Sequence, residues 1–258
     1  MWKAINDSVA GTSHHRTDTV CQDASFVTAW QHENESFLIL ACADGAGSAA
    51  KSEIGSKLAC KSVGKSATEF FEAGGRLGDG AEEVLRKWIV GAREEIEAEA
   101  TGLGVAPRAL ACTLLLAIVG EQAAWFAQIG DGAIVSFHED EYHPVFWPQA
   151  GQYPNETFFL TDSEYKKNIQ SETHAHRIDE IAMFSDGLQT LALNFATKSA
   201  HQPFFSPMFD ALRQTVDPTD LNVPLITFLN SEAINDRTDD DKTLILATRI
   251  NTRGDTVL

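Results

Sequence analysis

Acidic residues recur in this chain at the ends of strand-like segments, where they could together bind a divalent metal ion. Asp44, Asp131 and Asp186 each precede a glycine, and each closes an apolar run that is typical of a β-strand. The run from Asp239 to Asp241 has the reverse order, since it stands immediately before the strand-like segment KTLILATRI. In neighbouring antiparallel strands, the end of one lies beside the beginning of the next. The sequence therefore predicts that these four acidic positions meet at one edge of the fold.

Carboxylates gathered at one edge need a cation between them. Two like charges about 4 Å apart repel by about 4 kcal/mol at an effective dielectric constant of about 20. A divalent ion removes this cost, and oxygen ligands without Cys or His select hard ions such as Mg²⁺ or Mn²⁺. A glycine after the aspartate lets the backbone turn closely enough for its carbonyl to act as a further ligand. The pattern thus predicts a hard-metal site.

Each motif also has a simpler interpretation. Asp-Gly is a common turn dipeptide, and three consecutive aspartates are typical of a solvated loop that blunts the end of a strand. The coincidence of four acidic positions in matching settings favours the metal site over four independent turns.

The order of the predicted elements is typical of an α+β fold. Strands are predicted over 36–45, 109–119, 122–138, 156–162, 177–187 and 242–250, and helices over 48–75, 81–102, 188–196, 206–216 and 220–233. Residues 139–156 contain three prolines and are predicted to form an irregular loop.

Composition limits the class of protein. With 258 residues, 43% of them hydrophobic, the chain can bury one substantial core, and a single domain over 1–258 is expected. The formal net charge of −17 argues against nucleic acid and membrane surfaces as partners. No long apolar run or leader segment is present, and the four cysteines form no C-x-x-C pair. A soluble cytoplasmic protein with free thiols is expected.

The ordered motifs resemble those of the protein phosphatase 2C family, the metal-dependent Ser/Thr phosphatases. CADGAGSA, ACTLLLAIV, AQIGDGAIV, MFSDGLQTL and DDDKTLILA occur in the family's order, preceded by GTSHHRTDTVCQDAS. The resemblance covers roughly residues 8–250 and is greatest to compact bacterial members that consist of the catalytic domain alone. It implies a four-layer α-β-β-α sandwich of two antiparallel sheets flanked by helices, with a two-metal site at one end.

The resemblance also implies a ligand set for two Mn²⁺ or Mg²⁺ ions. Asp44 matches the carboxylate that bridges the ions, and the Gly45 carbonyl matches a ligand of the second ion. Asp186 and Asp240 match two further acids on the first ion. Asp23, in CQDAS, matches the acid that usually holds a metal-bound water.

Two positions depart from the family pattern. Asp131 matches the acid that some bacterial members use for a third, weaker metal, but Thr190 stands where the other acid of that site is often found. This argues against a third ion. Asp241 replaces the asparagine that usually follows the acid matching Asp240.

The resemblance implies hydrolysis of phosphoserine and phosphothreonine in proteins by a hydroxide that bridges the two metal ions. Phosphorylated proteins would be the substrates, with a cognate Ser/Thr kinase as a partner. A histidine or a metal-bound water is the usual proton donor. Ala46 replaces a histidine that many eukaryotic members carry after Asp-Gly, and His14 or His15 could substitute for it. Arg16, with His14, is the candidate for binding the substrate phosphate, although its spacing from Asp23 differs from the family's.

Two other functions stay open on the sequence. One is a catalytically silent fold that binds phosphoproteins and regulates them. The other is a metal-dependent hydrolase of small phosphate compounds or phosphodiesters. The presence of Asp44, Asp186 and Asp240 argues against the silent fold, because clustered acids are costly unless they hold a metal.

Overall fold

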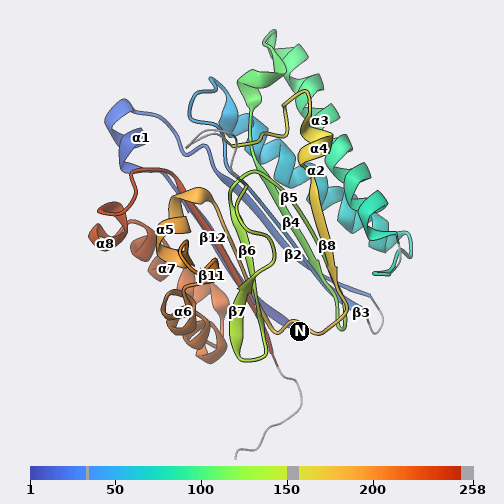
Figure 1. The fold of residues 1–258 in the computed structure, drawn as a ribbon, viewed down its shortest axis with the longest axis vertical. Helices are drawn as coiled ribbons and strands as arrows, with labels where there is room; N and C mark the ends of the chain where they lie inside the picture. Colours follow the sequence, from blue (N-terminus) through green and yellow to red (C-terminus); the bar gives the residue numbers. More distant parts are fainter. Residues whose placement is uncertain (33–34, 79, 150–156, 251–258) are drawn as a thin grey trace, which may run out of the picture.

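The structure, a computed structural model, describes residues 1–32, 35–78, 80–149 and 157–250. Two five-stranded antiparallel sheets pack face to face, and helices cover the outer face of each sheet (Figure 1). The fold is therefore the four-layer α-β-β-α sandwich that the resemblance implies.

One sheet carries the two long helices on its outer face. Its strands lie in the order β2 (Ala24–His32), β3 (Glu35–Ala43), β4 (Leu114–Val119), β5 (Ala124–Ile129) and β8 (Gln170–His174). Helices α2 (Ser52–Glu72) and α3 (Ala81–Leu103) pack on it. Residues 37–43 of β3 are all buried, because one face of the strand meets these helices and the other meets the second sheet.

The other sheet brings the two ends of the described chain together. Its strands lie in the order β1 (Trp2–Val9), β12 (Lys242–Arg249), β9 (Glu180–Phe184), β6 (Ala133–His138) and β7 (Glu141–Pro144). Its outer face is covered by α5 (Gln189–Ala192), α6 (Gln202–Gln214), α7 (Asn222–Leu229) and α8 (Glu232–Asn235). The short elements are α1 (Thr12–Thr17), η1 (Pro107–Leu110), α4 (Tyr165–Asn168), η2 (Asp186–Leu188), β10 (Leu193–Asn194), β11 (Ser199–Ala200) and η3 (Pro218–Leu221).

Four predictions about local structure are wrong. The helix predicted over 188–196 is only the short α5, which ends at Ala192, and Leu193–Asn194 form strand β10. Residues 157–162 form no strand, and 109–113 hold part of η1 instead of the start of β4. The predicted irregular loop over 139–156 contains strand β7, while residues 150–156 lie outside the described part. Glu139 and Asp140 both have positive φ, so a tight two-residue turn joins β6 to β7.

Two further expectations can be compared with the structure. The four cysteines are free thiols, as predicted, and three of them are buried. Within the described residues, no helix combines the length and the apolar character needed to cross a bilayer.

Candidate metal centre

The predicted acidic positions all occur where strands begin or end at one end of the sandwich. Asp44 directly follows β3, and Asp131 lies in the turn between β5 and β6. Asp186 opens η2 just after β9, and Asp240 lies two residues before β12. Because β12, β9 and β6 are antiparallel neighbours, the segments that carry Asp131, Asp186 and Asp240 come together. Asp44 joins them from the end of β3 in the facing sheet.

Electrostatic coupling shows that the acids are neighbours. Burial raises the pKa of Asp44 well above its usual range, and the charges of Asp23 and Asp186 raise it further. Burial also raises the pKa of Asp186 to about 6, to which the charges of Asp131 and Asp240 contribute, while a hydrogen bond with Asp44 lowers it. The pKa values of Asp131 and Asp240 are raised, again chiefly by burial. The carboxyl groups therefore tend to retain protons when no cation balances them.

Asp23 is the most firmly held of these acids. Its Oδ2 accepts hydrogen bonds from Ser185 Oγ at 2.7 Å and from Thr243 Oγ1 at 2.8 Å. Burial raises its pKa to about 7, although these two hydrogen bonds lower it. Since Asp23 precedes β2 while Ser185 and Thr243 belong to the other sheet, its carboxylate ties the two sheets together at this end.

The donor atoms fit a hard divalent cation. Oδ1 of Asp23, Asp131 and Asp186 is buried and has no hydrogen-bond partner among the described residues. Such atoms are costly unless a ligand satisfies them. Within the same residues, no group of three or more His, Cys, Asp or Glu side chains has closed into a coordination shell.

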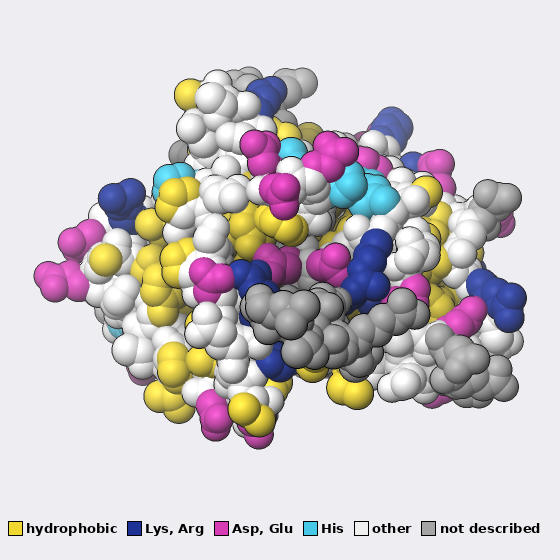
Figure 2. Space-filling model, turned by 90° about the horizontal axis from the view of Figure 1, so that it is seen from below, with side chains coloured by type: hydrophobic (Ala, Val, Ile, Leu, Met, Phe, Trp, Pro, Cys, Tyr) yellow, Lys and Arg dark blue, Asp and Glu magenta, His cyan; other side chains and the backbone are white. Residues whose placement is uncertain are grey.

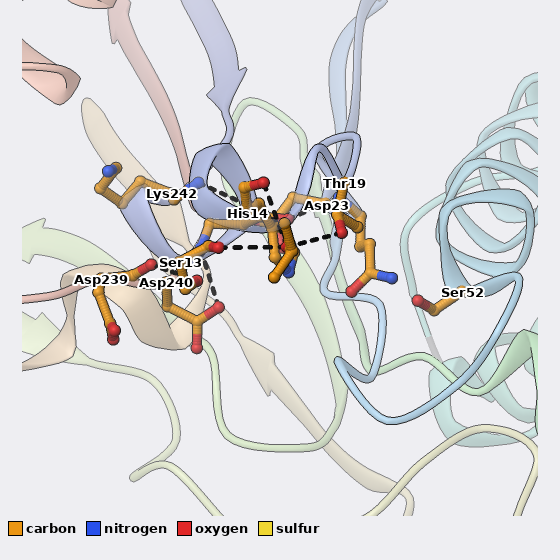
Figure 3. A network of polar contacts seen from close by, with 12 residues as sticks. Ser13, His14, Thr19, Asp23, Ser52, Asp239, Asp240 and Lys242 are labelled. Atoms are coloured by element: carbon orange, nitrogen blue, oxygen red, sulfur yellow. Dashed lines mark hydrogen bonds and ion pairs between the residues drawn. The ribbon is translucent and has the colours of Figure 1, made fainter.

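Asp241 joins the N-terminal segment to the loop before β12, beside this cluster. Figure 3 shows the polar network there, with Ser13, His14 and Asp23 from the N-terminal segment next to Asp239 and Asp240 from the loop. The buried carboxylate of Asp241 accepts the backbone N–H of Gly11 at 2.7 Å and that of Gln22 at 2.6 Å. His14 Nδ1 lies 2.8 Å from Asp241 Oδ1. The segment that carries Asp23 is thereby fixed to the segment that carries Asp240.

The three consecutive aspartates thus have different surroundings. Asp241 is buried and structural, whereas the side chain of Asp239 is exposed and pairs with Arg16 at 3.0 Å. The Asp239 carbonyl accepts hydrogen bonds from the backbone N–H and the hydroxyl of Ser13. Asp240, between them, is the one whose charge acts on Asp44 and Asp186.

Helix α1 places the candidate phosphate-binding residues next to the acidic loop. His14 contacts Asp241, and its charge lowers the pKa of Asp240. Arg16 and its partner Asp239 both expose about two thirds of their side chains. An exposed ion pair of this kind contributes only about 0–1 kcal/mol, so Arg16 can exchange Asp239 for another anion. His15 is exposed.

Several glycines at this end are required by close backbone packing. A Cβ on Gly45 would lie 2.6 Å from the Gln22 carbonyl oxygen. One on Gly187 would overlap the Asp241 carbonyl oxygen, and one on Gly11 would overlap the backbone of Asp240. The glycine after Asp186 therefore lets η2 pack directly on the loop that carries Asp240.

Replacing Gly187 by alanine is expected to destabilise the protein by about 1–3 kcal/mol, because the new methyl group forces apart two backbone segments. Gly91, inside α3, is the matched control, since a Cβ there meets open space. Gly91→Ala is expected to stabilise by roughly 0.5–1 kcal/mol. Urea unfolding measures both, and wild-type stability for Gly187→Ala would contradict the packing argument.

The residues that support the acids were not predicted from the sequence. Ser185 and Thr243 hold Asp23, and Thr113 Oγ1 accepts the backbone N–H of Asp44 at 2.9 Å. Only their positions in the sequence could have identified two of these residues. Ser185 stands beside Asp186, and Thr243 stands just after the aspartate run.

Known proteins share both the sequence pattern and the fold. Residues 10–230 match the family model described as Protein phosphatase 2C. The chain is 37% identical over 250 residues to serine/threonine-protein phosphatase 3 of Escherichia coli (strain K12), a match covering 95% of this chain and 98% of that relative.

Solved structures of bacterial phosphatases have the same fold. One is a bacterial serine phosphatase, with a TM-score of 0.65, 19% identity and coverage of 98% of this chain and 100% of that one. Another is the serine/threonine phosphatase Stp1 from Staphylococcus aureus, with a TM-score of 0.62, 20% identity and coverage of 97% and 96%. The chain therefore belongs to the protein phosphatase 2C family, and the enzyme class predicted from its motifs, a protein phosphatase, is confirmed.

Proposed function

We propose that this protein hydrolyses phosphoserine and phosphothreonine in proteins with the help of two Mn²⁺ or Mg²⁺ ions. The main observation behind the proposal is that Asp44, Asp186 and Asp240 lie together at one end of the sandwich. Buried carboxylate oxygens in this cluster have no hydrogen-bond donor among the described residues. The similarity to a serine/threonine-protein phosphatase over nearly the whole chain supports the substrate class.

The proposed ligands are those that the family resemblance implies, and the oxygen donors present are compatible with them. Asp44 would bridge the two ions, Asp186 and Asp240 would bind the first, and the Gly45 carbonyl would bind the second. When bound, the ions lower the pKa of a coordinated water toward neutrality and neutralise the phosphoryl oxygens of the substrate. Asp131, whose Oδ1 has no partner among the described residues, is the candidate ligand if a third ion binds, but Thr190 in place of the second acid argues against that ion.

Other residues of the chain would orient the reactants and move the proton. Asp23 is held through Oδ2, which leaves Oδ1 to accept a hydrogen bond from the attacking water. His14, whose Nδ1 lies 2.8 Å from Asp241 Oδ1, is proposed to protonate the leaving serine or threonine oxygen. Arg16 is proposed to bind the phosphate group in place of Asp239.

Metal removal and a choice of substrates test the proposal together. With Mn²⁺, the enzyme is expected to hydrolyse p-nitrophenyl phosphate and a phosphothreonine peptide, and not bis(p-nitrophenyl) phosphate. EDTA is expected to lower both rates more than about a hundredfold, and added Mn²⁺ to restore them.

The alternatives predict different outcomes in the same assay. If no substrate turns over with Mn²⁺, the phosphoprotein-binding module is favoured. If small phosphate compounds react far faster than phosphopeptides, the physiological substrate is a small molecule. Full activity after exhaustive treatment with EDTA would contradict metal dependence.

We also propose that the enzyme acts in the cytoplasm. The four free cysteines support this, because thiols stay reduced there. Phosphorylated proteins, and a cognate Ser/Thr kinase that generates them, are the proposed partners. The net charge of −17 disfavours nucleic acid and anionic membranes.

A further inference from the structure

A cavity of about 570 Å³ is lined by residues of α6 and α7. These helices lie on the side of the sandwich opposite α2 and α3 (Figure 1). The walls of the cavity include Phe204 and Met208 of α6 and Phe228 of α7. Its floor includes Ile5 of β1 and Leu246 of β12. The volume falls within the range of about 300–1,000 Å³ that is usual for small-molecule sites.

The walls are apolar and stiff. Pro203 and Pro207 of α6 and Pro224 of α7 line the cavity, and the fixed φ of proline limits how far the walls can collapse. Figure 2 shows hydrophobic side chains gathered on the flank where α6 and α7 lie in Figure 1. A preformed apolar cavity of this kind suits an alkyl chain.

Two side chains that can carry positive charge stand at the edge of the cavity. Arg237 and His201 both line it, and both are exposed. Among the residues that the structure describes, the Arg237 guanidinium makes no hydrogen bond or ion pair, although the chain has 37 acidic residues. A guanidinium without an acidic partner beside an apolar cavity selects a ligand with an anionic end.

We infer that this cavity binds a long-chain carboxylate, with the alkyl chain between α6 and α7 and the carboxylate on Arg237. The site is separate from the acidic cluster, since none of the five acids of that cluster lines it. Some of its lining residues are near the acidic cluster in sequence. Leu191, in α5, comes shortly after Asp186, and Arg237 comes shortly before Asp240.

Calorimetry with decanoate tests the inference on the full chain without added metal, so the result does not depend on phosphatase activity. Saturable binding of one decanoate per chain is expected. Decyltrimethylammonium, which has the same alkyl chain and the opposite charge, is expected to bind at least about tenfold more weakly.

Two variants probe the two ends of the site. Arg237→Gln is expected to weaken decanoate binding about tenfold. Ala211→Trp places a large side chain into the cavity from an exposed position on α6 and is expected to abolish binding. Arg108→Gln and Ala98→Trp are the matched controls, since both residues are exposed and lie on the other flank, and they are expected to bind decanoate normally.

Circular dichroism confirms that each variant is folded before binding is compared. The inference is overturned if the wild-type chain shows no saturable decanoate binding. It is also overturned if decyltrimethylammonium binds as tightly, or if folded Arg237→Gln and Ala211→Trp both bind like the wild type.

Discussion

Asp186→Asn is expected to lower phosphatase turnover more than about a hundredfold and, at the same time, to stabilise the metal-free protein at pH 7. The first effect follows because a neutral amide replaces a proposed ligand carboxylate, and even weaker perturbations around metal sites cost about 10–100-fold. The second follows because the burial and neighbouring charges that raise the pKa of Asp186 to about 6 also make its ionised form unfavourable in the folded state.

The pH dependence of this stabilisation has a definite sign. The folded pKa of Asp186, about 6, lies above its ordinary value of 3.8, so the unfolded chain releases the proton first as pH rises. The metal-free wild type therefore loses stability relative to Asp186→Asn between about pH 4 and pH 6, and the difference is constant above that range.

Two measurements check the prediction. Initial rates on p-nitrophenyl phosphate with saturating Mn²⁺ give the loss of activity, and thermal unfolding in EDTA from pH 4 to pH 8 gives the stability. Asp220→Asn, at an exposed position in η3, is the control and is expected to change neither. Wild-type turnover by Asp186→Asn would contradict the proposed site.

Asp241→Ala is expected to destabilise the protein by about 3–5 kcal/mol. It removes one buried carboxylate that accepts two backbone N–H groups, those of Gly11 and Gln22, and each buried donor left without an acceptor costs about 1–3 kcal/mol. Activity is expected to fall as well, because the segment that carries Asp23 loses its attachment to the loop that carries Asp240.

A graded series separates this effect from the loss of charge. Asp241→Asn keeps one acceptor oxygen but places an amide N–H group against the other donor. Its free energy of unfolding is therefore expected to lie between those of the wild type and Asp241→Ala. Asp239→Asn removes the same charge from an exposed ion pair and is expected to change stability by about 0–1 kcal/mol. Equilibrium urea unfolding measures all three. Equal stability of Asp241→Ala and Asp239→Asn would refute the structural role of Asp241.

The acidic cluster was predictable from sequence because the ends of strands are visible locally. Apolar runs that stop at Asp-Gly predict both the end of a strand and the location of the acid, and antiparallel pairing then brings Asp44, Asp131 and Asp186 to one edge. The long helices were predictable for a similar reason, since the buried face of α3 has a helical period.

The errors arise where distant contacts decide local structure. Strand β7 is stabilised by Tyr142, whose ring stacks on Phe209 and whose hydroxyl donates to Glu180. Strand β1 shows no regular alternation of apolar residues and forms because it pairs along its whole length with β12. Neither cause is present in the local sequence.

The apolar segment at 157–162 shows the opposite error. Its composition favours a strand, yet Leu160 is buried as part of a loop, with its N–H bonded to the Cys112 carbonyl. Asp162 accepts the N–H of Phe159 and closes a turn there. Hydrophobic content thus indicated burial at this segment correctly, and it did not indicate pairing with another strand.

The bond between Asp241 and Gly11 joins residues 230 positions apart, and this has a consequence for how the protein acquires activity. A ribosome must release nearly the whole chain before β12 can pair with β1 and bring Asp240 to the other acids. Contacts of such long range make folding slow. A truncated or partly synthesised chain that lacks β12 would therefore lack Asp240 at the acidic cluster and is expected to be catalytically inert.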